Sequence, residues 1–329
     1  MNSAARKHHY VTQAYLAAFT DTESKDGQFC VIDIQSRTCF RTSPKNVAAE
    51  RDFNRVDVEG KPPDFLEQEL ATFEGRAVQA IRNVNQTKTF PTDEDYNYII
   101  NLLCLFAVRN PQLRNSFNRS RELSIHLIGD LLVSDEKIWA HHLKKAQGAG
   151  YVGETSISFE EFKRSIKEGE YRIEFAPEGN LRVEFRTFDK ILQILGQRIW
   201  SLLVAPSSGP TFICSDHPVA LNWKGSGNKG PIGYGLKNTE VFFPLGPRTG
   251  LYGVYEEALP PIVHIDPVQV AIKNTMIEQS AERHVFSATN TLLLWEKGVM
   301  IEIDCCHIFP SSKCSKCRVG TPHHKIPTE

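Results

Sequence analysis

The sequence of 329 residues has no long apolar run and no excess of charge of one sign. Its longest apolar runs, such as Leu102 to Val108, fall far short of the roughly 20 residues that a membrane-spanning helix needs. The segment from Met1 to His9 also lacks the apolar core of a signal peptide. Lys and Arg number 38 and Asp and Glu 39, so no global field steers the chain to nucleic acid or an anionic membrane. We therefore expect a cytoplasmic protein that contacts any such partner through a local patch.

Several sequence signatures of catalysis are missing as well. Neither a Gly-x-Ser-x-Gly motif nor a His-Glu-x-x-His motif is present, which argues against an α/β-hydrolase and a zincin. The Gly-rich segment from Gly225 to Gly235 lacks the Gly-Lys-Ser/Thr ending of a phosphate-binding loop and does not fit a dinucleotide fingerprint. Eight cysteines in a chain of this length do not make a disulfide scaffold. Composition and pattern therefore indicate an architecture and candidate sites, but they name no reaction.

The first half of the chain carries helical patterns. Apolar side chains recur at helical spacing from Leu66 to Ile81, directly after Pro62-Pro63-Asp64. Thr92 followed by three acidic residues is typical of a helix start, and the apolar periodicity continues to Val108. Asn110-Pro111 interrupts this second helix, and further helices are predicted up to about residue 150.

The second half changes to short alternating segments. Tyr171 to Phe175 and Leu181 to Phe185 alternate around a Pro-Glu-Gly-Asn turn, which predicts a β-hairpin before a helix from about Phe188 to Leu203. Asp266-Pro267 supplies a cap and a first-turn proline for a helix to about Arg283. Other strands are predicted near residues 28–34, 38–41, 211–214, 239–243, 250–254, 291–295 and 299–303.

These elements predict an α+β fold, with long helices in the first half and a mixed or antiparallel sheet built mainly from the second half. No repeat and no sharp linker divides the chain, so residues 1–304 are expected to form a single intertwined domain. Its helical part spans about 62–150 and its strand-rich part about 170–304. Residues 305–329 form a Cys/His-rich basic tail.

The tail has Cys-x-x-Cys spacing and further soft ligands. Four thiolate or imidazole groups could hold Zn²⁺, and the candidates are Cys306, Cys314, Cys317 and His323. The alternative is a disordered basic tail with adventitious cysteines.

The opening Lys7-His8-His9-Tyr10-Val11-Thr12-Gln13-Ala14-Tyr15-Leu16-Ala17-Ala18-Phe19 resembles the start of the bacterial family called domain of unknown function 4238. Members of this family carry His-His-Tyr-Val-Pro-Gln-x-Tyr-Leu-x-x-Phe at this point. Further matches follow in order at residues 49–53, 67–74, 109–114, 215–219, 243–245 and 274–285. Two positions depart from the pattern, since Thr12 replaces a proline and Asn54 replaces an aromatic residue. The family implies no settled activity, so the resemblance nominates residues without nominating chemistry.

His8, His9 and Asp216 are candidate catalytic residues. Consecutive side chains in extended chain point to opposite faces, so at most one histidine faces a given site as a metal ligand or general acid/base. The alternative is that one histidine hydrogen-bonds the following helix while the other faces solvent. Asp216 follows a predicted strand and is a second candidate metal ligand, although an Asx turn closing that strand is the commoner role. If the site is real, His8 or His9 should lie within one side-chain shell of Asp216.

The predicted helices contribute carboxylates and guanidinium groups. Glu67 and Glu74 are seven residues apart and project from one helix face, where they could bind a divalent cation or form a solvated flank. Arg109 and Arg114 flank the Asn110-Pro111 break and could hold a phosphate, or they could neutralise the two glutamates. Tyr15, on the apolar edge of a short helix after Thr12, is a further candidate substrate contact.

The combination favours metal-assisted hydrolysis of a phosphodiester, with nucleic acid as the expected substrate. In this hypothesis His8 or His9, Glu67, Glu74 and Asp216 bind Mg²⁺, Mn²⁺ or Zn²⁺ or activate water, and the arginines hold the phosphate. The main alternative is a non-catalytic module that binds an anionic small molecule, a nucleotide or a protein partner. A third possibility is an interaction protein whose polar cluster only fixes the fold.

Overall fold

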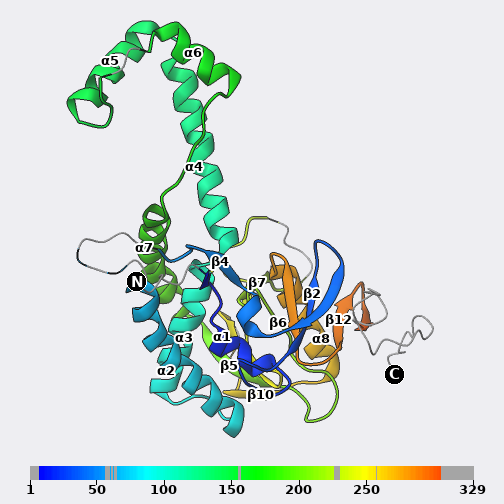
Figure 1. Ribbon diagram of the computed structural model, residues 1–329. Helices are drawn as coiled ribbons and strands as arrows, with labels where there is room; N and C mark the ends of the chain where they lie inside the picture. The colour runs from blue at the N-terminus through cyan, green and yellow to red at the C-terminus, as the bar shows by residue number, and fades with distance from the viewer. Residues whose placement is uncertain are drawn as a thin grey trace. The chain divides into compact units, whose positions relative to one another are not determined.

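The computed structural model describes residues 7–55, 60, 62, 65–154, 157–225, 230–256 and 258–304. Its contacts divide the chain into two compact units. The first unit combines the described residues up to Asn110 with those from Leu181 onward, and the second is Pro111–Asn180. The predicted α+β class is confirmed, because long helices occupy the first half and most strands the second (Figure 1).

The N-terminal segment forms two pairs of strands. β1 (Lys7–His9) pairs antiparallel with β4 (Ala49–Arg51), and the strands predicted near residues 28–34 and 38–41 are present as the antiparallel pair β2 (Phe29–Asp33) and β3 (Thr38–Thr42). The Asp33 carboxylate holds the hairpin turn by accepting the N–H groups of Gln35 and Ser36. Three short helical segments complete the region: α1 (Gln13–Leu16), η1 (Ala17–Phe19) and η2 (Pro44–Asn46).

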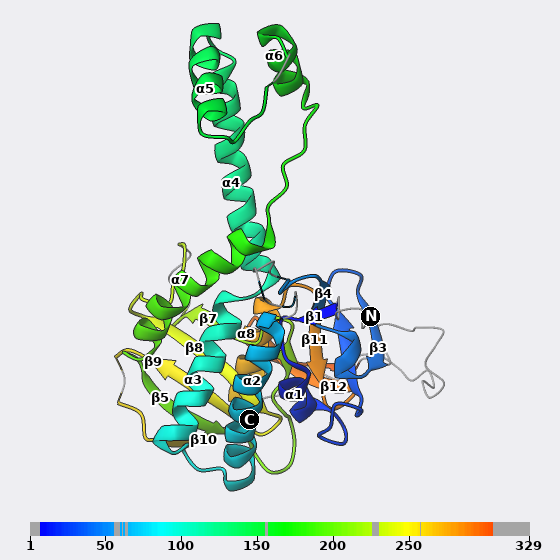
Figure 2. The same cartoon turned by 60° about the vertical axis from the view of Figure 1, so that its left-hand side comes forward.

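The two predicted helix starts after Pro62 and Thr92 are confirmed. α2 (Phe65–Thr87) buries the stripe that includes Ala77, Ile81 and Val84. α3 (Asp93–Val108) begins where the Thr92 hydroxyl accepts the N–H of Asp95, and nearly all of its second half is buried. The two helices lie side by side over the strands of the largest sheet (Figure 2).

The second unit contains α4 (Pro111–Leu132), α5 (Glu136–Gly148) and α6 (Phe159–Glu168). α6 was not predicted. Its signal is a capping box, in which Ser158 and Glu161 each bond the other's backbone N–H.

The hairpin predicted for residues 171–185 is wrong, because α7 (Pro177–Leu195) includes its second strand. Leu181, Phe188 and Leu195 recur every seven residues and so share one helix face. Pro177 occupies the first helical position, where its missing N–H is tolerated. The alternation from Leu181 to Phe185 is too short to distinguish the period of a strand from that of a helix.

The sheets are mixed and antiparallel. The largest has the order β10-β5-β9-β8-β7, in which β10 and β5 are parallel and the other pairs antiparallel. The helix predicted from about Phe188 to Leu203 is correct only as far as Leu195, because Ile199–Val204 form β5, a buried inner strand of this sheet. The bounds are β5 (Ile199–Val204), β7 (Ala220–Trp223), β8 (Thr239–Gly246), β9 (Thr249–Val254) and β10 (Ile262–His264).

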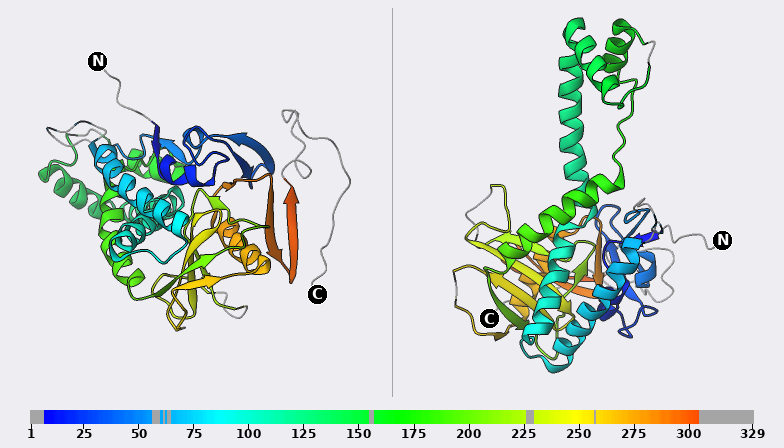
Figure 3. Two further views of the ribbon diagram at one scale, coloured as in Figure 1. Left: turned by 90° about the horizontal axis from the view of Figure 1, so that it is seen from below. Right: turned by 90° about the vertical axis from the view of Figure 1, so that its left-hand side faces the viewer.

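A second sheet, of order β3-β2-β11-β6, joins the N-terminal hairpin to β6 (Cys214–Ser215) and β11 (His284–Ser287). α8 (Pro267–Ser280) starts at the predicted cap Asp266 and packs against β6, β7 and β12 (Thr291–Glu296), which pairs with β13 (Val299–Asp304) (Figure 3). The second sheet thus combines strands from the N-terminal part of the chain with strands from its C-terminal half. Within the ranges that the structure describes, no helix is long and apolar enough to cross a membrane.

Candidate functional site

Polar side chains from separate parts of the first unit meet around the buried side chain of Asn54. We call His8, His9, Asn54, Glu67, Glu74 and Arg109 the polar cluster. The backbone N–H of Asn54 donates to His8 Nδ1 at 2.8 Å, and its side-chain amide donates to Glu67 Oε2 at 2.5 Å. The amide oxygen of Asn54 accepts from Arg109 Nε at 3.1 Å. Asn54 therefore links an imidazole through its backbone N–H, and a carboxylate and a guanidinium group through its side-chain amide.

Replacing Asn54 by alanine is expected to lower the free energy of unfolding by about 2–4 kcal/mol, because buried groups lose their partners. Chemical denaturation measures the change. Asn115→Ala, at an exposed position of α4, is the control and should change it by about 0.5 kcal/mol or less. Equal effects of the two variants would contradict a linking role for Asn54.

The two histidines have different environments, in line with the alternation of an extended segment. His8 is only 2% exposed and its Nδ1 is occupied by Asn54. His9 is half-buried, and its Nδ1 lies 3.3 Å from the side-chain amide of Gln13. Its Nε2 is buried and makes no well-formed hydrogen bond to a described residue, although the carbonyls of Lys45 and Pro44 lie near the ring. Burial, with the charge of Lys7 next, lowers the pKa of His9.

Glu74 lies in the field of both Arg109 and Glu67. Burial raises the pKa of Glu74, while Arg109 and a hydrogen bond from the Thr12 hydroxyl oppose this shift and the charge of Glu67 adds to it. Arg109 is itself 2% exposed and donates to the His9 carbonyl at 3.4 Å. This placement favours the account in which Arg109 balances the glutamates over one in which it holds a phosphate directly.

Asp216 is bound mainly by backbone N–H groups, and the imidazole near its carboxylate is that of His284, whose Nδ1 lies 4.0 Å from Asp216 Oδ2. Its carboxylate accepts the N–H groups of Glu282, Arg283 and His284 at 2.8–2.9 Å. Burial raises its pKa to about 6 even though these three hydrogen bonds oppose the shift. Its charge also helps to raise the pKa of Tyr10, after the burial of that hydroxyl. Asp216 thus fixes β6 to the segment before β11, and none of its side-chain hydrogen bonds to described residues involves His8 or His9.

Two other candidates, Tyr15 and Arg114, remain. Tyr15 is fully buried, stacks on Phe243 and donates its hydroxyl to the Pro244 carbonyl at 2.6 Å, which favours a core role. Arg114 lies in the first turn of α4, and the boundary between the two units falls between it and Arg109.

Among the residues that the structure describes, no three His, Cys, Asp or Glu side chains are grouped so that they alone could hold a metal ion. The candidate zinc ligands Cys306, Cys314, Cys317 and His323 lie outside the described residues.

A pocket of about 320 Å³ lies beside the C-terminal half of α2. Glu74, Val78 and Asn85 lie within about 40° of one another on the helix, and the last two line this pocket. The other lining residues come from the end of α2, from α1 and η1 with the turn that follows them, and from the β8–β9 turn. Its charged residues are Arg82, Lys88, Arg248 and Glu23. We call it the basic pocket.

None of the three cations of the basic pocket forms an ion pair with a described carboxylate. Arg248 Nη1 donates to the carbonyls of Pro206 and Pro210, and burial lowers the pKa of its guanidinium. Sequence reasoning missed this group, because positions 82, 88 and 248 share no motif and meet only through tertiary packing.

Comparisons with known proteins agree with the resemblance seen in the sequence. The model of a protein family of unknown function, DUF4238, matches residues 7–291. No curated protein and no solved structure matches the chain. Because the match covers most of its length, the chain belongs to the DUF4238 family.

Proposed function

We propose that this protein is a metal-assisted phosphodiester hydrolase whose substrate is a nucleic acid strand or another phosphorylated molecule. The observation that carries the proposal is that the charge of Glu67 acts on both His9 and Glu74, while Arg82, further along the same helix, lines the basic pocket. Carboxylates and imidazole suit a divalent cation, and guanidinium and ammonium groups suit phosphate. Positive and negative charges nearly balance over the whole chain, so a phosphate group has to be attracted by a local group of cations such as the one in the basic pocket.

The donor set fits Mg²⁺ or Mn²⁺ better than Zn²⁺. Magnesium is usually held by one or two carboxylates with water and substrate oxygens completing its shell, so Glu67 and Glu74 suffice as protein ligands. Structural zinc instead needs four protein ligands and catalytic zinc three. When bound, a divalent cation supplies Lewis-acid polarisation of a phosphoryl oxygen.

The residues of this chain would take the following roles. His9, which its lowered pKa keeps neutral near pH 7, accepts a proton from the attacking water. The water oxygen bonds to phosphorus, the ester P–O bond breaks, and the leaving oxygen takes a proton from solvent. Asn54 and Arg109 are positioning residues, because they hold Glu67 and balance the carboxylates.

The experiment measures cleavage of labelled single-stranded DNA, RNA and bis(4-nitrophenyl) phosphate with MgCl₂ or MnCl₂ and after chelation. We expect cleavage that disappears on chelation and returns when the cation is restored. Arg82→Gln with Lys88→Gln should raise the KM for the strands by about tenfold, since two phosphate contacts are lost. Arg119→Gln, at an exposed position of α4, is the control. Absence of cleavage with either cation would contradict the proposal.

The second candidate is a non-catalytic module that binds a nucleotide or another small anion. The cations of the basic pocket favour it, since they provide anion recognition without any reaction. Retention of a nucleotide without turnover, lost on the Arg82→Gln and Lys88→Gln changes, would support this candidate instead.

A further inference from the structure

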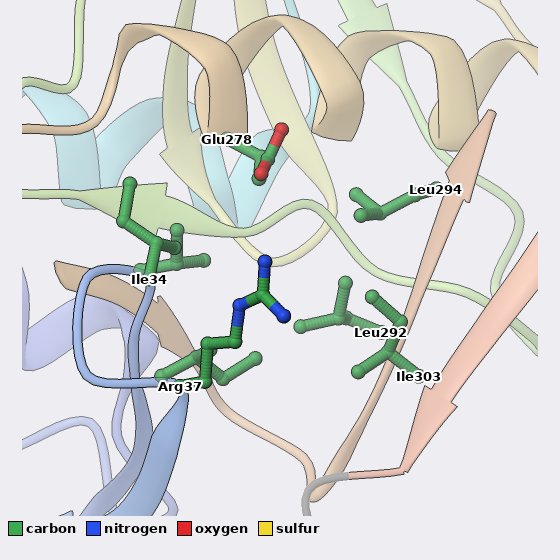
Figure 4. A pocket seen from close by; sticks show the side chains of 8 residues that line it. Ile34, Arg37, Glu278, Leu292, Leu294 and Ile303 are labelled. Atoms are coloured by element: carbon green, nitrogen blue, oxygen red, sulfur yellow. The ribbon is translucent and has the colours of Figure 1, made fainter. Parts of the chain in front are cut away.

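A second pocket, of about 420 Å³, lies among α8, β11, the β2–β3 turn and the β12–β13 hairpin (Figure 4). We call it the aliphatic pocket. Its described lining has six aliphatic side chains, Ile32, Ile34, Val285, Leu292, Leu294 and Ile303. The other two lining residues are charged, Arg37 and Glu278. It shares no lining residue with the basic pocket and contains no member of the polar cluster.

The two charged side chains enter the aliphatic pocket from opposite sides. Arg37 projects from the β2–β3 turn and Glu278 from the last turns of α8, and both point into the hollow (Figure 4). In the described part of the chain, neither forms an ion pair with the other or with another residue. Burial and the nearby charge of Glu296 raise the pKa of Glu278. A cation next to Glu278 would therefore stabilise its ionised form.

The backbone at Arg37 is suited to glycine rather than to arginine. Its φ is +53°, in the left-handed region that side chains disfavour. The Asp33 carboxylate fixes the two preceding residues and so holds the turn in this conformation. An arginine is less stable here than glycine would be, so its side chain is a good candidate for a ligand contact.

We propose that the aliphatic pocket binds a small zwitterion with an aliphatic body, such as a branched aliphatic α-amino acid. The ligand carboxylate pairs with the planar guanidinium of Arg37, its ammonium pairs with Glu278, and its side chain contacts the aliphatic wall. A ligand with one charge would leave one of the two protein charges without a partner. This binding does not depend on the proposed hydrolase activity.

Calorimetric titration of the full chain with L-leucine and L-isoleucine tests the proposal. We expect a dissociation constant of about 1 mM or lower for at least one of them. 4-Methylpentanoate lacks the ammonium group and isopentylamine lacks the carboxylate, so each should bind at least about tenfold more weakly. Absence of binding by both amino acids up to about 20 mM would overturn the proposal, and so would equal binding of the singly charged analogues.

Variants separate ligand contact from structure. Arg37→Gly should weaken leucine binding at least about tenfold while leaving the melting temperature unchanged or higher, because glycine tolerates this φ. Lys297→Gly, at a residue with φ +51° in the β12–β13 turn outside the pocket lining, is the matched control and should bind as the parent does. Glu278→Gln should remove the preference for leucine over 4-methylpentanoate. Unchanged leucine binding by Arg37→Gly would overturn the assignment.

Discussion

Replacing Asp216 by alanine is expected to lower the free energy of unfolding at neutral pH by about 3–5 kcal/mol. The Asp216 side chain is 2% exposed and accepts the backbone N–H groups of Glu282, Arg283 and His284. Alanine would leave three backbone N–H donors of this segment without their acceptor. That segment leads into β11, which pairs with both β2 and β6, so the loss should spread through the second sheet.

Chemical denaturation measures this effect, and its pH dependence identifies the carboxylate. Burial raises the pKa of Asp216 from 3.8 to about 6, so the folded chain holds the proton more tightly than the unfolded chain. Its contribution to stability is therefore largest at low pH, falls as pH rises from about 4 to about 6, and is constant above that, a change of up to about 3 kcal/mol. The difference between parent and Asp216→Ala should shrink over this window.

Asp130→Ala, at an exposed position of α4, controls for the loss of one carboxylate. It should change the free energy of unfolding by about 0.5 kcal/mol or less. A similar small change for Asp216→Ala would show that the segment before β11 is held by other contacts.

Glu67→Gln and Glu74→Gln are each expected to lower the rate of phosphodiester cleavage by about 100-fold or more, if the proposed function is right. Each substitution keeps the size of the side chain but removes one anionic oxygen ligand of the divalent cation. Calorimetric titration with MnCl₂ should show weaker binding for both variants. The cleavage rate and the affinity for Mn²⁺ together show whether a variant has lost the bound cation or only the rate of the cleavage step.

Glu69→Gln is the matched control, because it makes the same change at an exposed position of the same helix. It should keep the cleavage rate and the affinity for Mn²⁺. Variants of Glu67 and Glu74 that cleave like Glu69→Gln but melt at lower temperature would assign the polar cluster a purely structural role.

The sequence by itself determined the family, the α+β class and those elements whose signals are local. Thr92 and Asp266 mark helix starts because a capping side chain bonds a backbone N–H only three residues away. The helix at residues 177–195 was missed because a short alternating segment fits either period until its packing partners are known. Local signals therefore predicted most helices and strands. They failed where a short segment fits both the helix and the strand period, because tertiary contacts then decide which one forms.

In the candidate site, too, the sequence identifies some residues and the tertiary structure identifies the contacts between them. His9, Glu67, Glu74 and Arg109 could be nominated by residue type and position, yet nothing in the sequence says that Asn54 joins three elements. Asp216 looked like a site carboxylate, but its partners lie more than 60 positions later and are backbone groups, which carry no sequence signature. The cations of the basic pocket and the opposed charges of the aliphatic pocket come from distant segments. Only the tertiary structure decided these groupings, because contacts between distant segments depend on how whole elements pack against one another.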